Sequence, residues 1–284
     1  MIADNFRQFL ASNKFILTPC CGDALTAKLI AQAEFPATFV SGFGLVASRL
    51  GLPDTGLISF GEILDQFRSI KSAADNFLIV DGDTGYGNEM NVRRTVAEYS
   101  RAGAACVMIE DQVAPKRCGH TEGKQVIDYD AACRRIQAAV DARNEIGDIA
   151  IIARTDALAT LGIDEAIRRA NKFHEIGCEI TFVESPGSIE DLQRIAAETN
   201  GYRMANMLEG GLTPFLQPAE VSELGFSIVA YPFTILTRVV KETQRVLESM
   251  RSGVIPDPAM TFAELRKVVG FDDYYEMEKR YHHR

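Results

Sequence analysis

Carboxylates stand directly after two neighbouring apolar runs of this chain. Asp81 and Asp83 follow Phe-Leu-Ile-Val at 77–80, and Glu110 follows Cys-Val-Met-Ile at 106–109. Because Asp81 and Asp83 flank one glycine, we expect them to share a face of an extended strand, with Glu110 on the neighbouring strand. Three carboxylates at one point repel one another, and oxygen donors at this density suit Mg²⁺ or Mn²⁺. The pattern predicts a metal site; the alternative interpretation of residues 81–87 is a plain glycine-rich turn.

A thiol in the next polar segment has cationic neighbours. The segment 116–120 reads Lys-Arg-Cys-Gly-His, so Cys118 lies beside Lys116, Arg117 and His120. Positive neighbours favour the thiolate form of a cysteine. Cys118 is therefore a candidate acid or base, and the alternative is an unreactive loop thiol.

Eight short apolar runs with little polar alternation separate these groups, as expected of parallel strands buried on both faces. Helix-like segments lie between them. Eight strand and helix pairs predict a closed (β/α)8 barrel of the TIM type, with a doubly wound open sheet as the alternative. We expect one domain over 1–284, with 237–284 as a C-terminal helical extension. The expected strands are 15–18, 38–40, 77–80, 106–109, 149–152, 180–183, 202–205 and 227–230, and the expected helices are 23–33, 60–72, 91–102, 130–142, 163–176, 189–199, 219–224 and 237–251.

Polar residues follow most of these strands at the end where a barrel builds its active site. Besides the carboxylates, this rim carries Ser41, Arg154, Glu184 and Asn206. A structural protein does not need such a rim, so the arrangement predicts an enzyme.

Composition narrows the choice of partners. The chain has 284 residues, a net charge of −9 and six cysteines without a Cys-x-x-Cys pair. An acidic surface does not attract nucleic acid or anionic membranes, so we expect neither as a partner. The N-terminus has no signal-like or membrane-spanning run, and reduced thiols fit a cytoplasmic protein.

The tail beyond residue 237 is longer than a barrel needs and ends in a tyrosine-rich segment, 271–281. On a lone barrel its aromatic residues would be poorly covered. We expect them to pack on a neighbouring subunit of a homo-oligomer; the alternative is an ordinary helix folded back on its own barrel.

Four motifs together resemble the isocitrate lyase and phosphoenolpyruvate mutase superfamily. They are Asp-Gly-Asp-Thr-Gly-Tyr-Gly at 81–87, Lys-Arg-Cys-Gly-His at 116–120, Ala-Arg-Thr-Asp at 153–156 and Asn-Met-Leu-Glu-Gly-Gly at 206–211. The cysteine motif is similar to that of the carbon–carbon lyase branch, which includes 2-methylisocitrate lyase and the 2-alkylmalate and dimethylmalate lyases. The resemblance implies a (β/α)8 barrel whose C-terminal helix is swapped between subunits, usually in a tetramer.

The resemblance also implies a Mg²⁺-dependent enzyme, with Mn²⁺ as a substitute, that cleaves a 2-hydroxy di- or tricarboxylate to a 2-oxo acid such as pyruvate plus a carboxylate. Cys118 would protonate the enolate carbon of the departing acid. The implied catalytic residues are Cys118, His120, Lys116 and Glu184; the substrate-binding residues are Ser41, Gly42, Phe43, Gly119, Arg154, Asn206, Met207 and Leu208; the metal ligands are Asp81, Asp83, Glu110 and Asp54.

Several positions depart from 2-methylisocitrate lyases. Phe39 stands where those enzymes have Tyr, and Thr237 stands in place of an Arg that holds a carboxylate, with Arg238 beside it. The departures favour a substrate with two carboxylates, because Thr cannot replace a bidentate Arg contact. The base for the hydroxyl proton stays open. Alternatives are an oxaloacetate hydrolase that forms oxalate and acetate, a phosphoryl mutase, and a barrel that binds a dicarboxylate without catalysis.

Overall fold

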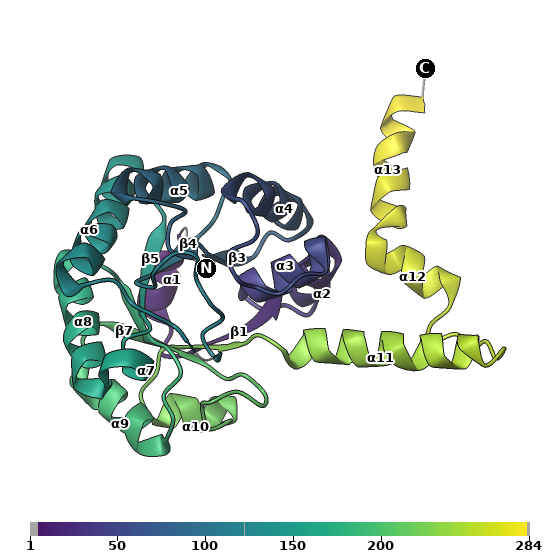
Figure 1. Ribbon diagram of the computed structural model, residues 1–284. Coiled ribbons are helices and arrows are strands. Elements are labelled where there is room, and N and C mark those ends of the chain that lie inside the picture. Colours follow the sequence, from purple (N-terminus) through teal and green to yellow (C-terminus); the bar gives the residue numbers. More distant parts are fainter. Residues whose placement is uncertain (1–4, 122, 283–284) are drawn as a thin grey trace. The chain divides into compact units, whose positions relative to one another are not determined.

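Eight parallel strands close into a barrel in chain order, each hydrogen-bonded to the next and β8 to β1 (Figure 1). The computed structural model describes residues 5–121 and 123–282. The closed barrel confirms the predicted (β/α)8 fold and excludes the open sheet, and each expected run overlaps its strand. The strands are β1 (Ile16–Cys21), β2 (Ala37–Val40), β3 (Phe77–Asp81), β4 (Cys106–Glu110), β5 (Ala150–Thr155), β6 (Ile180–Val183), β7 (Tyr202–Asn206) and β8 (Ile228–Tyr231).

Helices cover the outside of the barrel, and all eight predicted helices are present. Three short helices, α1, α3 and α7, are additional to the prediction, and the part of the expected C-terminal helical extension beyond residue 251 contains two helices, α12 and α13. The helices are α1 (Phe6–Ser12), α2 (Ala24–Gln32), α3 (Gly42–Leu50), α4 (Phe60–Ala73), α5 (Glu89–Arg101), α6 (Tyr129–Ile146), α7 (Leu158–Leu161), α8 (Ile163–Ile176), α9 (Ile189–Glu198), α10 (Pro218–Glu223), α11 (Thr234–Arg251), α12 (Phe262–Val269) and α13 (Phe271–His282).

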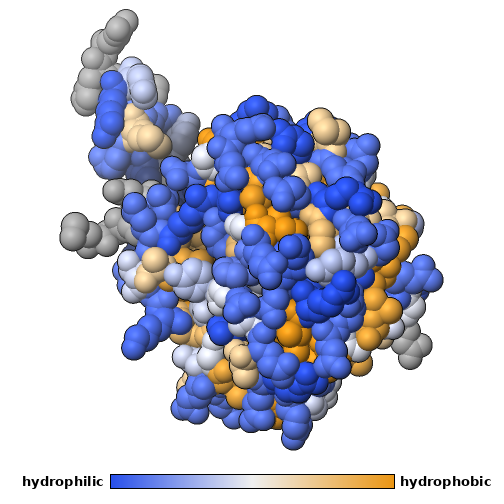
Figure 2. All heavy atoms as spheres, turned by 90° about the vertical axis from the view of Figure 1, so that its left-hand side faces the viewer, coloured by the Kyte–Doolittle hydropathy of each residue, from blue (hydrophilic) through white to orange (hydrophobic). Residues whose placement is uncertain are grey.

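The strands are mainly apolar because successive side chains enter two different cores. Ile79 and Met108 point into the barrel, where they join one buried cluster. Leu78 and Val107 point outward, where they pack under the helices. Figure 2 shows the other side of this arrangement: over α6, α8 and α9 the surface is mainly hydrophilic, with narrow hydrophobic strips. The helices therefore bury the outer faces of the strands, and the polar residues of the candidate site lie at the strand ends.

Helix α1 closes the N-terminal end of the barrel. Phe6 and Leu10 belong to the interior cluster, and the Phe6 ring lies 5.5 Å from the ring of Phe77 at the start of β3. Arg7 makes an ion pair with Glu179 at 2.8 Å and donates to the carbonyl of Ile149 at 3.0 Å. The barrel interior is thus filled and capped at this end, so a ligand can enter only at the opposite rim.

The described chain forms two compact units, one up to Leu236 and one from Thr237 onward. The second unit contains most of α11 and all of α12 and α13. Within it, Arg266 lies over the rings of Phe262, Phe271 and Tyr275, while Phe262 and Tyr281 keep 73% and 81% of their surface exposed. In the described ranges, no helix is long and apolar enough to span a membrane.

Candidate active site

A small pocket opens among the carboxyl ends of the strands. Its free volume is about 60 Å³, which suits a small organic acid and not a nucleotide-sized cofactor. One side of its wall is charged and the other is apolar. The predicted site residues that line it are Ser41, Phe43, Asp54, Asp81, Lys116, Cys118, Gly119, His120, Arg154, Glu184, Asn206 and Leu208; the wall also includes Cys20, Phe39, Met108, Arg117, Phe182, Met204, Ala230, Pro232 and Phe233.

The paired aspartates do not lie on one strand as predicted. Asp81 is the last residue of β3, whereas Asp83 lies in the following turn with φ of 48°. The backbone N–H of Asp83 donates to Asp81 Oδ1 at 3.0 Å, so the turn folds back on the strand end. Gly42 does not line the pocket. A Cβ there would come 2.6 Å from Asp81 Oδ2, so this glycine leaves room for the carboxylate.

Lys116 joins two of the acids. Its Nζ lies 2.7 Å from Asp54 and 2.8 Å from Asp83, and its side chain is only 5% exposed. Burial opposes a charge on Lys116, but Asp83, Asp81 and Asp54 together hold its pKa well above the usual value. The ammonium group therefore stays charged and neutralises part of the acidic cluster.

The acidic cluster consists of four carboxyl groups, Asp54, Asp81, Asp83 and Glu110, against two buried cations, Lys116 and Arg154. Burial raises the pKa of Glu110 well above its usual value. Burial and the negative charge of Asp83 raise the pKa of Asp81 to about 6. Glu110 Oε1 is buried without a hydrogen-bond partner. With the side chains as they stand, the described residues include no group of three or more acidic, His or Cys side chains arranged around a metal position. The donors themselves, all carboxylate oxygens, fit Mg²⁺ or Mn²⁺.

Arg154 forms the basic centre of the site. Its Nε lies 2.8 Å from Asp156 Oδ2 and 3.3 Å from Glu110, and its Nη2 donates to Asp156 Oδ1 at 3.0 Å. Burial opposes its charge, yet Asp156, Glu184 and Glu110 hold the pKa of Arg154 well above the usual value. The guanidinium is therefore a permanent cation fixed in the pocket wall.

His120 links two loops. Its Nδ1 accepts a hydrogen bond from the backbone N–H of Leu212 at 3.0 Å, which places the ring proton on Nε2, 3.0 Å from Glu184 Oε1. Burial raises the pKa of Glu184, but Arg154 and His120 outweigh it and lower the pKa to about 2. Glu184 is thus an ionised partner of both His120 and Arg154.

The structure corrects the expected ionisation of Cys118. Burial of this half-buried thiol raises its pKa, and this outweighs the hydrogen bond from the His120 backbone N–H and the charge of Arg154. Lys116 is paired with Asp54 and Asp83, and Arg154 is paired with Asp156. Cys118 therefore holds its proton and is a candidate acid, and the predicted thiolate is wrong. All six cysteines are free, as expected.

The other predicted binding residues separate into two groups. Asn206, at the end of β7, and Leu208 line the pocket, but Met207 is fully buried in the outer core, where its sulfur accepts from the N–H of Leu216 at 3.5 Å. Ser41 caps α3 through its hydroxyl. Its own N–H donates to the carbonyl oxygen of Cys21, so this backbone N–H is not available to a ligand, whereas the residue itself lines the pocket.

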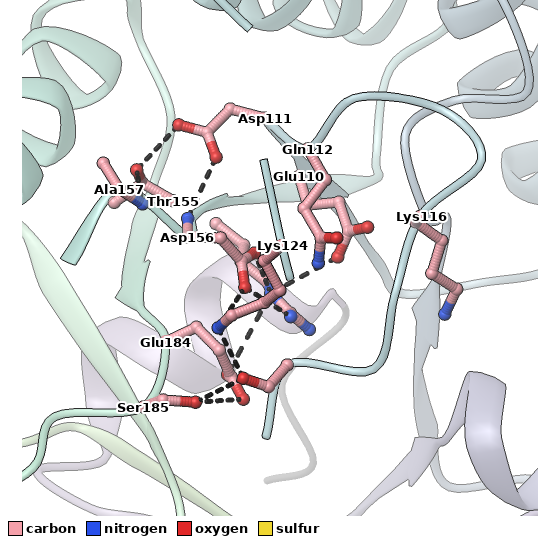
Figure 3. Close-up of polar contacts among 12 residues, drawn as sticks. Glu110, Asp111, Gln112, Lys116, Lys124, Thr155, Asp156, Ala157, Glu184 and Ser185 are labelled. Atoms are coloured by element: carbon pink, nitrogen blue, oxygen red, sulfur yellow. Dashed lines mark hydrogen bonds and ion pairs between the residues drawn. The ribbon is translucent and has the colours of Figure 1, made fainter. Parts of the chain in front are cut away.

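Four buried residues under the pocket escaped the sequence analysis as site residues: Asp111, Lys124, Asp156 and Ser185. Lys124 reaches Asp156 at 2.9 Å (Figure 3). Asp156 holds Arg154, and Ser185 donates to the Gly119 carbonyl at 2.7 Å. Asp111 and Ser185 directly follow the candidates Glu110 and Glu184, and Asp156 lies two positions after Arg154, so their place at the rim was a usable signal.

Comparisons with known proteins agree with this geometry. A family model described as phosphoenolpyruvate phosphomutase matches residues 6–251. The chain is 40% identical to the 2,3-dimethylmalate lyase of Eubacterium barkeri over 98% of both chains. It is 34% identical to the 2-methylisocitrate lyase of Halalkalibacterium halodurans over 98% of this chain and 93% of the relative. A solved structure of oxaloacetate acetylhydrolase with 3,3-difluorooxalacetate superposes with a TM-score of 0.94 at 32% identity, covering 98% of this chain and 96% of that one.

Proposed function

The chain belongs to the phosphoenolpyruvate mutase and isocitrate lyase superfamily and is a carbon–carbon lyase; we propose that it cleaves a 2-hydroxy dicarboxylate of the 2-alkylmalate type to a 2-oxo acid and a second carboxylate. The observation that carries this proposal is that a protonated Cys118, a fixed Arg154 and the carboxylates of Asp54 and Asp81 line one pocket. Asp83 and Glu110 do not line it, but they contact the lining residues Lys116 and Arg154.

The chain's own groups divide the reaction between them. Arg154 and Asn206 bind the carboxylate of the departing half, where negative charge develops as the C2–C3 bond breaks. The bond's electron pair goes to C3, and the Cys118 thiol gives its proton to that carbon. His120 and Glu184 keep the segment around Cys118 in register. Phe39 has no titratable group, so the base that takes the hydroxyl proton is another residue.

Asp81, Asp83 and Glu110, with Asp54, would hold a divalent cation, Mg²⁺ or Mn²⁺. When bound, such a cation supplies Lewis-acid polarisation of a hydroxyl and a carboxylate oxygen. Lys116, which pairs with Asp54 and Asp83, would balance part of the charge of these carboxylates.

The apolar side of the pocket supports an alkyl-substituted substrate. Phe43 and Phe233 pack with their ring centroids 4.6 Å apart, and both line the wall together with Phe39. An alkyl group against these rings gains hydrophobic contact, while the second carboxylate meets Arg154. Thr237, which stands in place of the carboxylate-binding Arg of 2-methylisocitrate lyases, and the neighbouring Arg238 both belong to the second unit.

Oxaloacetate hydrolysis is the second candidate, because the oxaloacetate acetylhydrolase structure superposes so closely. Both reactions break a C2–C3 bond and form the same kind of enolate.

A substrate panel tests the assignment. Purified protein with Mg²⁺ is incubated with 2-alkylmalates, dimethylmalate, methylisocitrate, oxaloacetate and phosphoenolpyruvate, and the products are assayed for 2-oxo acid, oxalate or phosphonopyruvate. Pyruvate from a substituted malate supports the proposal. Oxalate alone would establish the hydrolase, phosphonopyruvate the mutase, and no product the non-catalytic binder. Omission of Mg²⁺ and its replacement by Mn²⁺ test the cofactor.

We propose also that the protein is a cytoplasmic homotetramer in which the segment from Thr237 onward is exchanged between subunits. The free cysteines support a reducing compartment, and the exposed Phe262 and Tyr281 support a partner for the second unit. The expectation of a cytoplasmic location is based in part on the N-terminal sequence, of which residues 1–4 lie outside the described residues. Sedimentation of the intact chain and of a chain ending at Leu236 tests the assembly: a monomeric intact chain would refute it. Cell fractionation tests the location.

A further inference from the structure

Lys124 is a buried cation in an exposed stretch of loop between β4 and α6. Thr121, Gly123 and Gln125 are exposed, whereas the Lys124 side chain keeps only 2% of its surface accessible. An ammonium group is buried at high cost unless it is paired. Its partners therefore indicate what the burial is for.

Both partners of Lys124 belong to the active-site wall. Its Nζ lies 2.9 Å from Asp156 Oδ1 (Figure 3). The same Nζ donates a hydrogen bond to the carbonyl oxygen of Gly119. Gly119 lies between Cys118 and His120. Lys124 therefore hydrogen-bonds to the backbone between these two candidate catalytic residues. Ser185 Oγ donates to the same carbonyl at 2.7 Å.

The fit around Gly119 leaves little tolerance. A Cβ at this position would lie 2.3 Å from Glu184 Oε1 and 2.6 Å from Arg154 Nη2. The peptide therefore rests directly on the charged wall, and a small movement of Gly119 would displace the residues on both sides.

Asp156 couples this contact to Arg154. Its Oδ1 accepts from both Arg154 Nη2, at 3.0 Å, and Lys124 Nζ. Asp156 is itself held by Asp111, which accepts its backbone N–H at 2.9 Å. Lys124 thus draws part of the Asp156 charge away from Arg154 and leaves that guanidinium more positive toward the pocket.

We propose that Lys124 is a positioning residue for the reaction: it fixes the Gly119 carbonyl and thereby sets the Cys118 thiol and the His120 ring against the substrate. The catalytic consequence rests on the proposed function, whereas the positioning of Cys118 does not. The two can therefore be tested separately.

The first test needs no substrate. Alkylation of Cys118 by iodoacetamide is followed by mass spectrometry, with Cys133 on α6 as the reference thiol in the same chain. Loss of a hydrogen bond from a charged donor shifts the equilibrium between the fixed and the displaced position of Gly119, and hence of Cys118, by about tenfold or more. We expect Lys124→Met to speed alkylation of Cys118 about tenfold and leave Cys133 unchanged, while Lys124→Arg stays near the unmodified protein.

Two further variants sharpen this test. Lys14→Met removes an exposed lysine that precedes β1, and it should leave both thiols unchanged. Ser185→Ala removes the neutral donor to Gly119 and should speed Cys118 alkylation by about two- to tenfold. It also serves if Lys124→Met does not fold. Equal alkylation of Cys118 with and without Lys124, or an equal rise at Cys133, would overturn the proposal.

The second test uses whichever substrate the panel identifies. Misplacement of Cys118 acts on the chemical step, so Lys124→Met should lower kcat at least about tenfold, change KM less than about threefold, and regain activity as Lys124→Arg. A rise in KM with unchanged kcat would contradict the positioning role. If no panel substrate reacts, the alkylation result still decides whether Lys124 positions Cys118.

Discussion

Asp111 lies beneath the pocket and supports it through three hydrogen bonds. Its carboxylate accepts from Thr155 Oγ1 at 2.7 Å, from the Asp156 N–H at 2.9 Å and from Arg169 Nη1 at 2.9 Å. Asp111 is fully buried, and Arg169 is 2% exposed with Glu165 as its other acidic partner. Replacement by Ala would leave three donors without an acceptor, one of them a buried guanidinium.

The expected cost of Asp111→Ala follows from this count. Removal of one partner of a buried ion pair destabilises a protein by about 3–5 kcal/mol. At about 2–4 °C per kcal/mol for a domain near this size, Tm should fall by roughly 6–20 °C. Asp111→Asn keeps the shape of the side chain and one acceptor oxygen, so it should lower the free energy of unfolding by about half as much as Asp111→Ala. Turnover should fall too, because Asp156 would no longer hold Arg154 and Lys124 in place.

Urea unfolding followed by circular dichroism measures the free energy, and a double-mutant cycle with Arg169→Met isolates the ion pair. The double variant should lose less than the sum of the two single variants, since it buries no unpaired charge. A loss below about 1 kcal/mol for Asp111→Ala, or strict additivity with Arg169→Met, would refute the reasoning.

Three other predictions follow from the site. Cys118→Ser should lower turnover by about 10²- to 10⁴-fold while calorimetric Mn²⁺ affinity stays the same; near-normal turnover would exclude Cys118 as the acid. Gly119→Ala forces a Cβ to within 2.3 Å of Glu184 and should cost about 1–3 kcal/mol, whereas Gly61→Ala on α4, where the nearest atom is 4.0 Å away, should be neutral or stabilising by urea unfolding. The pKa of Glu184 is about 2 in the folded state, below its ordinary value of 4.5. The ionised carboxylate therefore contributes to the free energy of unfolding above about pH 4.5, and this contribution disappears as the pH falls toward 2. Glu184→Gln should remove acid sensitivity on the order of 3 kcal/mol in that window, and an unchanged stability profile from pH 5 to 3 would count against the ion pair with Arg154.

The strands could be predicted because both of their faces are buried. Ile79 and Leu78 enter different cores, so β3 appears in the sequence as an unbroken apolar run. Helix α3 could not, since it begins at Gly42 and depends on burial of Leu45 and Val46 for its place. Propensity at such a helix is overridden by tertiary packing.

The site could be predicted as a set of strand-end residues but not as a network. Lys124 and Asp156 are 32 positions apart, and nothing local in the sequence indicates that their side chains meet. The ionisation of Cys118 shows the same limit: its neighbours in sequence are cationic, but burial of the thiol, with the nearby carboxylates of Asp54 and Glu184, raises its pKa.

The seal that α1 forms across the N-terminal end of the barrel constrains the kinetics of a lyase built on this pocket. One molecule enters and two leave, and all must pass the same rim because Phe6 and Leu10 fill the other end. The fragment nearer the barrel floor is trapped behind the one nearer the rim. Release of products is therefore ordered by depth: the outer product binds only after the inner one, and the inner product alone competes with substrate for the empty enzyme.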